Sequence, residues 1–468
     1  MSKPTSSASR RTFLKQTAAL SMAGVATPMA LNLAAMAEAA ASTATDYKAL
    51  VCVFLYGGND NGNTVIPYDQ ASYNLYNGLR PTLSYARGAL DATALAPSMA
   101  LSGGLQFALA PELAPLLPLF NAGQLAVQLN VGTLIQPTSK QQYVARSVPL
   151  PSKLFSHNDQ QSEWQSSAPE GAVSGWGGRI GDLFESGNGH STFTCVNVSG
   201  NAVYLSGNQA VQYQVTPSGS IALKAQKSLF GSTACAQTLL ELITQQRAHL
   251  MEAEYNRVMQ RAIDANALLS TNLQPASVIT STIPVPPNQT QAPSNALWDQ
   301  LKLVARMIAS ADALGAKRQV FFVSMGGFDT HDGLLTVHPG LLTQLADALA
   351  AFFNTTVELG VANRVTTFTA SDFGRTLSGN NDGSDHGWGS THFVLGGAVK
   401  GQRFYGTPPV IASNGPDDVG QGRLIPTTSV DQYAATLASW FGVSASDMLT
   451  VLPNLKNFDV STRNVGFV

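Results

Sequence analysis

Two short polar stretches of this chain hold residue types that bind divalent metal ions. They are GGFDTHDG at 326–333 and SDHGWGSTHF at 384–393, and together they contain three of the seven histidines. The candidate ligands in them are Asp329, His331, Asp385, His386 and His392. Imidazole and carboxylate suit zinc first, with manganese, magnesium or calcium as alternatives where carboxylates dominate. We therefore predict a divalent metal site that is built from both stretches.

The elements that would position these residues are buried strands of a parallel sheet. Apolar, β-rich runs at 49–56, 319–325 and 364–370 each predict a strand that is buried on both faces. Helical periodicity at 297–315 and 340–359 places a helix before and after the second strand. This order predicts an α/β fold with a central, mostly parallel sheet and helices on both faces.

Each of these strands runs into a polar loop, and ligands of open α/β sheets bind at the carboxyl ends of the strands. Asp60 follows the first strand, Asp329 the second and Asp372 the third. We expect the three carboxylates to converge as metal ligands, with Arg375 beside them as a catalytic residue that holds an anion bidentately. In an alternative interpretation, Asp329 and Asp372 cap the helices that follow them.

A third polar stretch, KLFSHNDQQSEWQ at 153–165, offers a nucleophile. Ser156 has the pattern of a helix N-cap, and the field of a helix N-terminus would also favour a hydroxyl nucleophile there. Thr64 is the second candidate nucleophile. His157 is a candidate substrate or metal contact, and His338 is predicted to be a surface residue at a helix start.

The N-terminal segment has the pattern of an export signal. SRRTFLK, with its pair Arg10 and Arg11, precedes an alanine-rich apolar stretch that Pro28 interrupts. We predict that residues 1–41 are a twin-arginine signal peptide, which is recognised by the twin-arginine export machinery and then removed. The mature protein would be periplasmic or secreted, without a permanent membrane span.

The remaining residues, 42–468, are predicted to form a single α/β domain with an irregular insertion at about 185–296. Within that insertion, 192–222 is expected to be a small antiparallel excursion and 235–270 to be helical. Near the end of the chain, Ser429 and Gln432 have the spacing of a helix capping box.

Composition limits the partners of this chain. It has 27 Lys and Arg against 29 Asp and Glu, and only 12% of its residues are charged. Without a basic stripe, nucleic acid is not an expected partner. Cys52 is expected in a core strand, whereas Cys195 and Cys235 could pair in an oxidising compartment.

Several motifs together resemble a bacterial family known as domain of unknown function 1501, which is similar to the alkaline phosphatase and sulfatase superfamily. The resemblance spans about 48–458. It rests on FLYGGNDNGNTVIPY, SHNDQQSEW, GWGGRIGDL, VFFVSMGGFDTHD, TFTASDFGRT, DHGWGSTHFVLGGAVKGQRFYG, GRLIPTTSVDQYAATLASWFG and PNLKNF. It implies an alkaline phosphatase-like sheet, an Asp/His metal centre and hydrolysis of phosphate or sulfate esters.

The resemblance also assigns ligands. Asp329 and His331 would form one ligand group, with Asp372 as the aspartate after a strand and His386 or His392 as the late histidine. The chain departs from the superfamily at Phe373, which stands where a histidine is expected. The pair Asp385–His386 could take that place.

Three functions remain open from the sequence. The first is a metal-dependent hydrolase of small anionic phosphate or sulfate esters, although the Cys-x-Pro-x-Arg motif of sulfatases is absent. The second is a non-catalytic periplasmic binding or assembly protein on the same fold. The third is a serine esterase of the SGNH type, which GGND suggests but which lacks the preceding Gly-Asp-Ser block.

Overall fold

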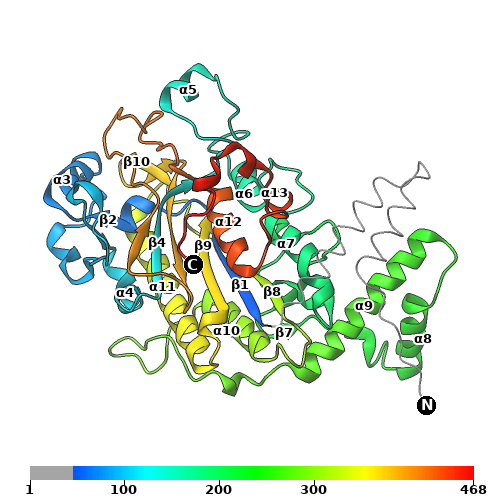
Figure 1. The fold of residues 1–468 in the computed structure, drawn as a ribbon. Helices are drawn as coiled ribbons and strands as arrows, with labels where there is room; N and C mark the ends of the chain where they lie inside the picture. The colour runs from blue at the N-terminus through cyan, green and yellow to red at the C-terminus, as the bar shows by residue number, and fades with distance from the viewer. Residues whose placement is uncertain (1–45) are drawn as a thin grey trace, which may run out of the picture. The chain divides into compact units, whose positions relative to one another are not determined.

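A mixed ten-stranded sheet forms the centre of the computed structural model, which describes residues 46–468 (Figure 1). Its strand order is β13-β4-β12-β9-β1-β8-β5-β6-β7, and β14 pairs with β4. The described residues form one compact unit. The predicted signal peptide lies outside the described residues.

Three central strands carry the predicted parallel arrangement. They are β1 (Lys48–Leu55), β8 (Arg318–Met325) and β9 (Val365–Ser371), and β1 pairs in parallel with both of the others. Alternate side chains of β1 enter two different cores: Val53 packs in one, and Cys52 in the other. A strand that is buried on both faces in this way reads as a continuous apolar run, which is the pattern seen in the sequence.

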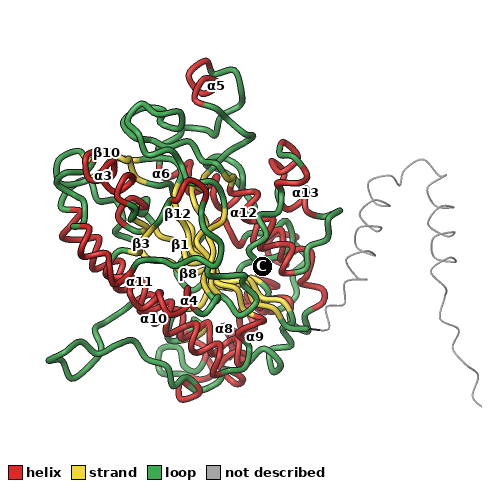
Figure 2. The backbone as a smooth tube through the Cα atoms, turned by 60° about the vertical axis from the view of Figure 1, so that its left-hand side comes forward, coloured by secondary structure: helices red, strands yellow, loops and turns green. Residues whose placement is uncertain are grey.

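Helices cover both faces of the sheet, and this confirms the predicted α/β class (Figure 2). The core on one face includes α10 (Ala296–Ala309) and α11 (Leu334–Glu358). The core on the other face includes α7 (Trp176–Phe184) and α12 (Val430–Phe441). The capping box predicted for α12 is present, because Ser429 and Gln432 each bond to the other's backbone N–H.

One side of the sheet departs from parallel pairing. β12 (Ser390–Leu395) runs antiparallel to both β9 and β4 (Leu125–Gly132). β13 (Arg403–Tyr405) and β14 (Thr428–Ser429) then pair in parallel with β4. The sheet is therefore mostly, but not entirely, parallel.

The middle of the chain extends the main sheet, so the antiparallel excursion predicted for 192–222 is wrong in part. β5 (Cys195–Asn197) pairs in parallel with β8, and β6 (Tyr213–Thr216) pairs in parallel with β5. Only β7 (Gly219–Ser220) is antiparallel to its neighbour. Alternating residues indicate a strand but not its partner, and here the partner of β5 lies far along the chain. The predicted helical stretch is confirmed as α8 (Thr233–Thr244) and α9 (Leu250–Asn272).

Shorter elements complete the fold. They are α3 (Gln70–Leu79), α4 (Leu117–Asn121), α5 (Lys140–Ala145), α6 (His157–Ser166), α13 (Met448–Val451), β2 (Val65–Pro67), β3 (Phe107–Leu109), β10 (Arg375–Gly379) and β11 (Ser384–His386). Among the described residues, no helix is both long and apolar enough to cross a bilayer.

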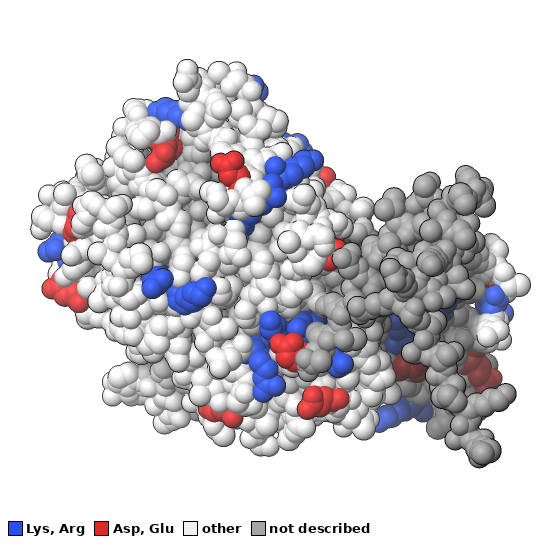
Figure 3. Space-filling model, in the orientation of Figure 1, with Lys and Arg blue, Asp and Glu red and all other residues white. Residues whose placement is uncertain are grey.

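The structure places the three cysteines and shows how the few charged residues are distributed. Cys52 is buried in β1, Cys195 is buried in β5 and Cys235 is exposed on α8, and all three are free thiols. On the face drawn in Figure 3, charged side chains are few and scattered among neutral ones.

Candidate metal centre

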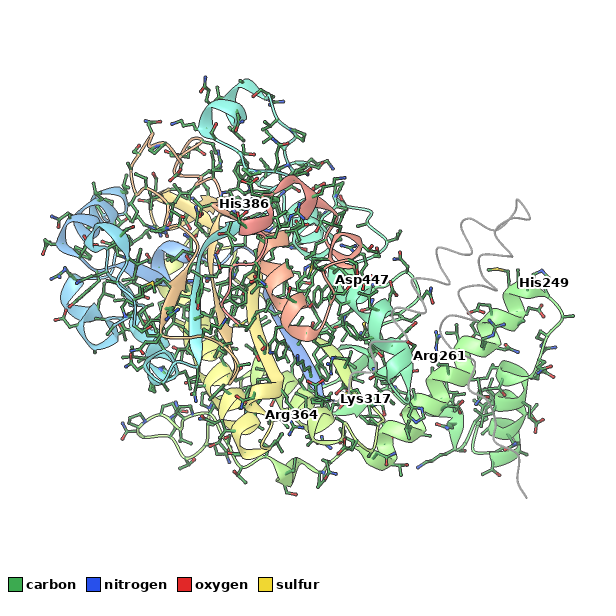
Figure 4. The ribbon with its side chains drawn as sticks, in the orientation of Figure 1. His249, Arg261, Lys317, Arg364, His386 and Asp447 are labelled. Atoms are coloured by element: carbon green, nitrogen blue, oxygen red, sulfur yellow. The ribbon has the colours of Figure 1, made fainter. Side chains whose placement is uncertain are left out.

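The candidate site lies at the carboxyl ends of the central parallel strands. Figure 4 shows His386 at this edge, whereas Lys317 and Arg364, which directly precede β8 and β9, lie at the opposite edge. Asp329 follows β8 and Asp372 follows β9. The parallel strands therefore deliver both carboxylates to one edge, as expected for ligand sites of α/β sheets.

Four side chains converge there on a common point. His157, Asp329 and His386 each offer a ligand atom, and these atoms lie within 4.8 Å of one another. His331 joins them, with its Nε2 2.9 Å from His386 Nε2 and 3.0 Å from Asp329 Oδ1. We call these four side chains the donor cluster. The Asp329 side chain is 44% exposed and that of His331 is 41% exposed, so the donor cluster is open to solvent.

Each histidine of this donor cluster is held through its Nδ1 atom. His157 Nδ1 donates to Asp372 Oδ2 at 2.6 Å, and His386 Nδ1 donates to the Phe155 carbonyl at 2.7 Å. His331 Nδ1 lies 3.3 Å from Asp385 Oδ1. Because a carbonyl or carboxylate oxygen only accepts, these contacts favour the neutral tautomer with its proton on Nδ1, in which Nε2 keeps a lone pair for a metal ion. Outer partners hold metal-ligating histidines in the same manner.

The three Nε2 atoms lie close to the Asp329 carboxylate, at 3.0 to 3.3 Å. His157 Nε2 is buried and makes no well-aligned hydrogen bond among the described residues, and Asp329 Oδ2 lies 3.3 Å from it. Two neutral imidazoles with Nε2 atoms 2.9 Å apart repel each other unless a proton or a cation lies between them. A divalent cation would satisfy all four groups at once, so the donor set fits a metal ion.

The pKa values of the site residues follow from burial and from their charged neighbours. The hydrogen bond to Asp372 raises the pKa of His157, and burial lowers the pKa of His386. Burial raises the pKa of Asp329, but the hydrogen bond and charge of Arg375 outweigh it, so the net pKa is lowered. Asp329 is therefore ionised at neutral pH, which is the state that a metal ligand requires.

Arg375 holds Asp329 rather than standing free for an anion. Its side chain is fully buried, and its Nη1 donates to Asp329 Oδ1 at 2.6 Å and to the Gly57 carbonyl at 3.2 Å. Its Nε and Nη2 donate to Ser384. The bidentate anion contact predicted for Arg375 is thus taken up by protein groups.

Phe373 stands at the position where the resemblance predicts a histidine. Its ring packs against two histidines of the donor cluster. Its ring lies 4.9 Å from that of His157 and 4.6 Å from that of His386, centre to centre. Gly58 makes room for it, because a Cβ there would lie 2.5 Å from the Phe373 ring. Gly58 also has a φ of +81°, which favours glycine.

Three predicted site residues do not reach the donor cluster. Asp60 is buried against Arg80, and although burial raises its pKa, the Arg80 charge lowers it to about 2. Thr64 is buried, and its hydroxyl donates to the Asp60 carbonyl at 2.6 Å. His392 is buried in β12, with its ring 4.9 Å from that of Trp164. Each is therefore engaged within the core rather than at the site.

Two other predictions are corrected by where the helices begin. The interpretation of Asp329 and Asp372 as helix caps is wrong, because α11 has Gly333 at its N-cap and Asp372 leads into β10. His338 is not a surface residue. The helix starts four residues before it, which places His338 on the buried face, where its Nε2 lies 2.9 Å from Asn59 Oδ1.

Ser156 occupies the N-cap position of α6, as predicted, but its hydroxyl does not cap the helix. It donates to Asp159 Oδ2 at 3.1 Å. The sequence analysis missed Gln161, whose Nε2 donates to Asp372 Oδ2 at 2.8 Å. Its spacing of four residues from His157, on the same helix face, was the available signal.

The comparisons with known proteins identify a family. The chain belongs to the family described as "Protein of unknown function (DUF1501)", whose model matches residues 47–451. No curated protein matches this sequence. Among solved structures it is similar to Ps i-CgsB, with 11% identity over 89% of this chain and 77% of that chain and a TM-score of 0.35. It is also similar to the PsFucS1 sulfatase from Pseudoalteromonas sp., with 7% identity over 91% and 73% of the chains and a TM-score of 0.31.

The helix that carries His157 also carries a buried acid, and we expect it to make stability depend on pH. Burial raises the pKa of Glu163 to about 7, with Asp431 and Asp159 adding to the effect. As pH rises from about 4.5 to 7, the unfolded chain releases this proton while the folded protein keeps it, so folding becomes less favourable. Above pH 7 the cost is constant, on the order of 3 kcal/mol.

The variant Glu163→Gln isolates this effect from the buried histidines, which titrate in the unfolded chain over the same range. By urea unfolding, we expect it to match the wild type near pH 5 and to be more stable by about 2–3 kcal/mol at pH 8. Glu170→Gln, at an exposed position, is the control. Equal stability of Glu163→Gln and the wild type at pH 8 would contradict the assignment.

Proposed function

We propose that this protein is a metal-dependent hydrolase of phosphate or sulfate esters. Its metal ligands would be His157, Asp329, His331 and His386. The observation that supports this is the convergence of three imidazole Nε2 atoms on one carboxylate. This donor set suits zinc first, with manganese, magnesium or calcium as alternatives.

The chain's own residues would hold and shield this centre. A bound divalent ion would polarise the ester oxygen and make a coordinated water more acidic. Asp372, Asp385 and the Phe155 carbonyl orient the three imidazoles, and Arg375 orients Asp329. Such outer contacts fix the ligand atoms before any ion arrives.

The test begins with elemental analysis of protein purified without chelator or a histidine tag. We expect about one equivalent of a divalent ion, and turnover of p-nitrophenyl phosphate or p-nitrophenyl sulfate that stops with chelator and returns with the ion. The variant Ser156→Ala in the same assay separates a serine nucleophile from an attacking water. Full metal content without turnover of any ester would instead support the non-catalytic binding or assembly protein.

We also propose that the chain is exported to the periplasm or beyond by the twin-arginine machinery. The motif SRRTFLK supports this. Replacing Arg10 and Arg11 with lysine should leave the protein unprocessed in the cytoplasm. Unchanged processing and export of that variant would refute this route.

A further inference from the structure

Arg423 contacts His386 and Phe155, the residue whose carbonyl holds the His386 ring. Its Nε donates to the His386 carbonyl at 3.0 Å. Its guanidinium carbon lies 4.7 Å from the centre of the Phe155 ring, and Phe155 is the residue whose carbonyl accepts from His386 Nδ1. The guanidinium therefore contacts the backbone of one residue of the donor cluster, although no sequence motif pointed to it.

The loop that carries Arg423 is built to hold it still. Asp418 is buried and accepts from the backbone N–H groups of Asn414, Gly420 and Gly422 at 2.8, 2.7 and 2.9 Å. The backbone of Arg423 is bonded on both sides, to the carbonyl of Gly420 and to the N–H of Val419. Ordering of this kind before binding lowers the entropic cost of taking up a ligand.

Most donors of the Arg423 side chain remain free. Its Nε has a partner, but its two terminal nitrogens have none among the described residues, and the side chain is half-buried. Arg375 and Arg80 differ, because their terminal nitrogens bond to carboxylates of the protein, Asp329 and the buried Asp60. A guanidinium with two free terminal nitrogens matches two oxygens of a tetrahedral oxyanion.

The charge of the site also calls for such a group. Asp329, Asp372 and Asp385 bring three carboxylates to the site, and the Arg375 guanidinium is bonded to the first of them. An anionic ester would be repelled by this excess unless further positive charge faced it. A divalent ion and the Arg423 guanidinium together would reverse the balance.

We propose that Arg423 forms the anion subsite of this centre and binds the non-bridging oxygens of a phosphate or sulfate group. This deepens the proposed function and rests on it. The test is calorimetric titration of inorganic phosphate and, separately, inorganic sulfate into the full-length, metal-loaded protein. The two titrations decide which of the two anions the subsite prefers.

The variants are Arg423→Gln and Arg423→Lys, with Arg364→Gln as the control at the opposite edge of the sheet (Figure 4). We expect Arg423→Gln to weaken binding of the preferred anion about tenfold or more, because it removes charge-assisted hydrogen bonds. Arg423→Lys keeps the charge but not the paired N–H groups of the guanidinium, so its anion affinity should lie between those of the wild type and Arg423→Gln. The anion affinity of Arg364→Gln should match the wild type. Metal content, measured in parallel, should be the same in all four proteins.

Four results would be decisive in other ways. Wild-type affinity in Arg423→Gln, or no binding of either anion to the wild type, overturns the subsite. Loss of metal from both Arg423 variants would make Arg423 a positioning residue for His386 and also overturn it. If the wild type holds no metal but its anion affinity still depends on Arg423, the subsite stands and the proposed hydrolase fails.

Discussion

Replacing His386 or Asp329 with alanine is expected to abolish stoichiometric metal binding while the fold persists. Both side chains are ligands in the proposed centre, and both are at the solvent-facing end of the sheet rather than in a hydrophobic core. Loss of a mere outer-shell partner lowers metal affinity by about 10- to 100-fold, so loss of a ligand should cost about 100-fold or more. Metal content after dialysis and circular dichroism of the same samples measure the two parts of this prediction.

The matched control is His249→Ala, at an exposed histidine far from the site (Figure 4). It should keep the metal content of the wild type. His392→Ala extends the comparison, because His392 was a predicted ligand that the structure places in the core. It should lose stability rather than metal. Full metal content in both His386→Ala and Asp329→Ala would show that the donor cluster is not a metal site.

The central part of the site could be predicted from the sequence because topology constrains it strongly. Parallel strands that are buried on both faces must end at the same edge of the sheet, so Asp329 and Asp372 had to approach each other. The stretch that carries His386 was predicted to form the site together with the one that carries Asp329. β10 and β11 provide this: they form an antiparallel pair in which Arg375 lies opposite His386.

The parts that could not be predicted depend on side-chain direction and on backbone groups. His392 lies within β12, where a shift of one residue moves a side chain to the other face of the sheet, and the sequence does not fix that register. The carbonyl that orients His386 belongs to Phe155, whose φ of +74° is unusual for an aromatic residue. No side-chain motif indicates a backbone acceptor of this kind.

The role of Asp60 could not be predicted either, because it depends on an ion pair with Arg80 that the sequence does not indicate. It follows a buried strand, as a metal ligand would, but Arg80 neutralises it from 20 positions along the chain. Gly62 makes this possible, since a Cβ there would overlap the Arg80 guanidinium. The same Asp60 carboxylate accepts from Ser384, the residue that also holds Arg375. Asp60 therefore supports the site from within the core.

We expect Arg80→Met to destabilise the protein by about 3–5 kcal/mol, which is the usual cost of leaving one partner of a buried ion pair uncompensated. Both side chains of the Asp60–Arg80 pair are fully buried, and Arg80 donates to both carboxylate oxygens. Urea unfolding at pH 7 measures the loss. Arg257→Met removes an exposed ion pair with Glu254 and should cost less than about 1 kcal/mol.

The double variant Asp60→Asn with Arg80→Met shows whether the destabilisation by Arg80→Met comes from the unpaired Asp60 carboxylate or from lost packing of the Arg80 side chain. If the cost of Arg80→Met comes from the unpaired carboxylate, neutralising Asp60 should recover about half of it or more, because a neutral amide is cheaper to bury than an ion. If the two changes instead add, the pair contributes through packing of the Arg80 stem rather than through charge. Additive costs would remove the electrostatic reason for excluding Asp60 from the metal centre. Recovered stability in the double variant would mean that the Asp60 carboxylate is held by Arg80 and is not available to bind an ion.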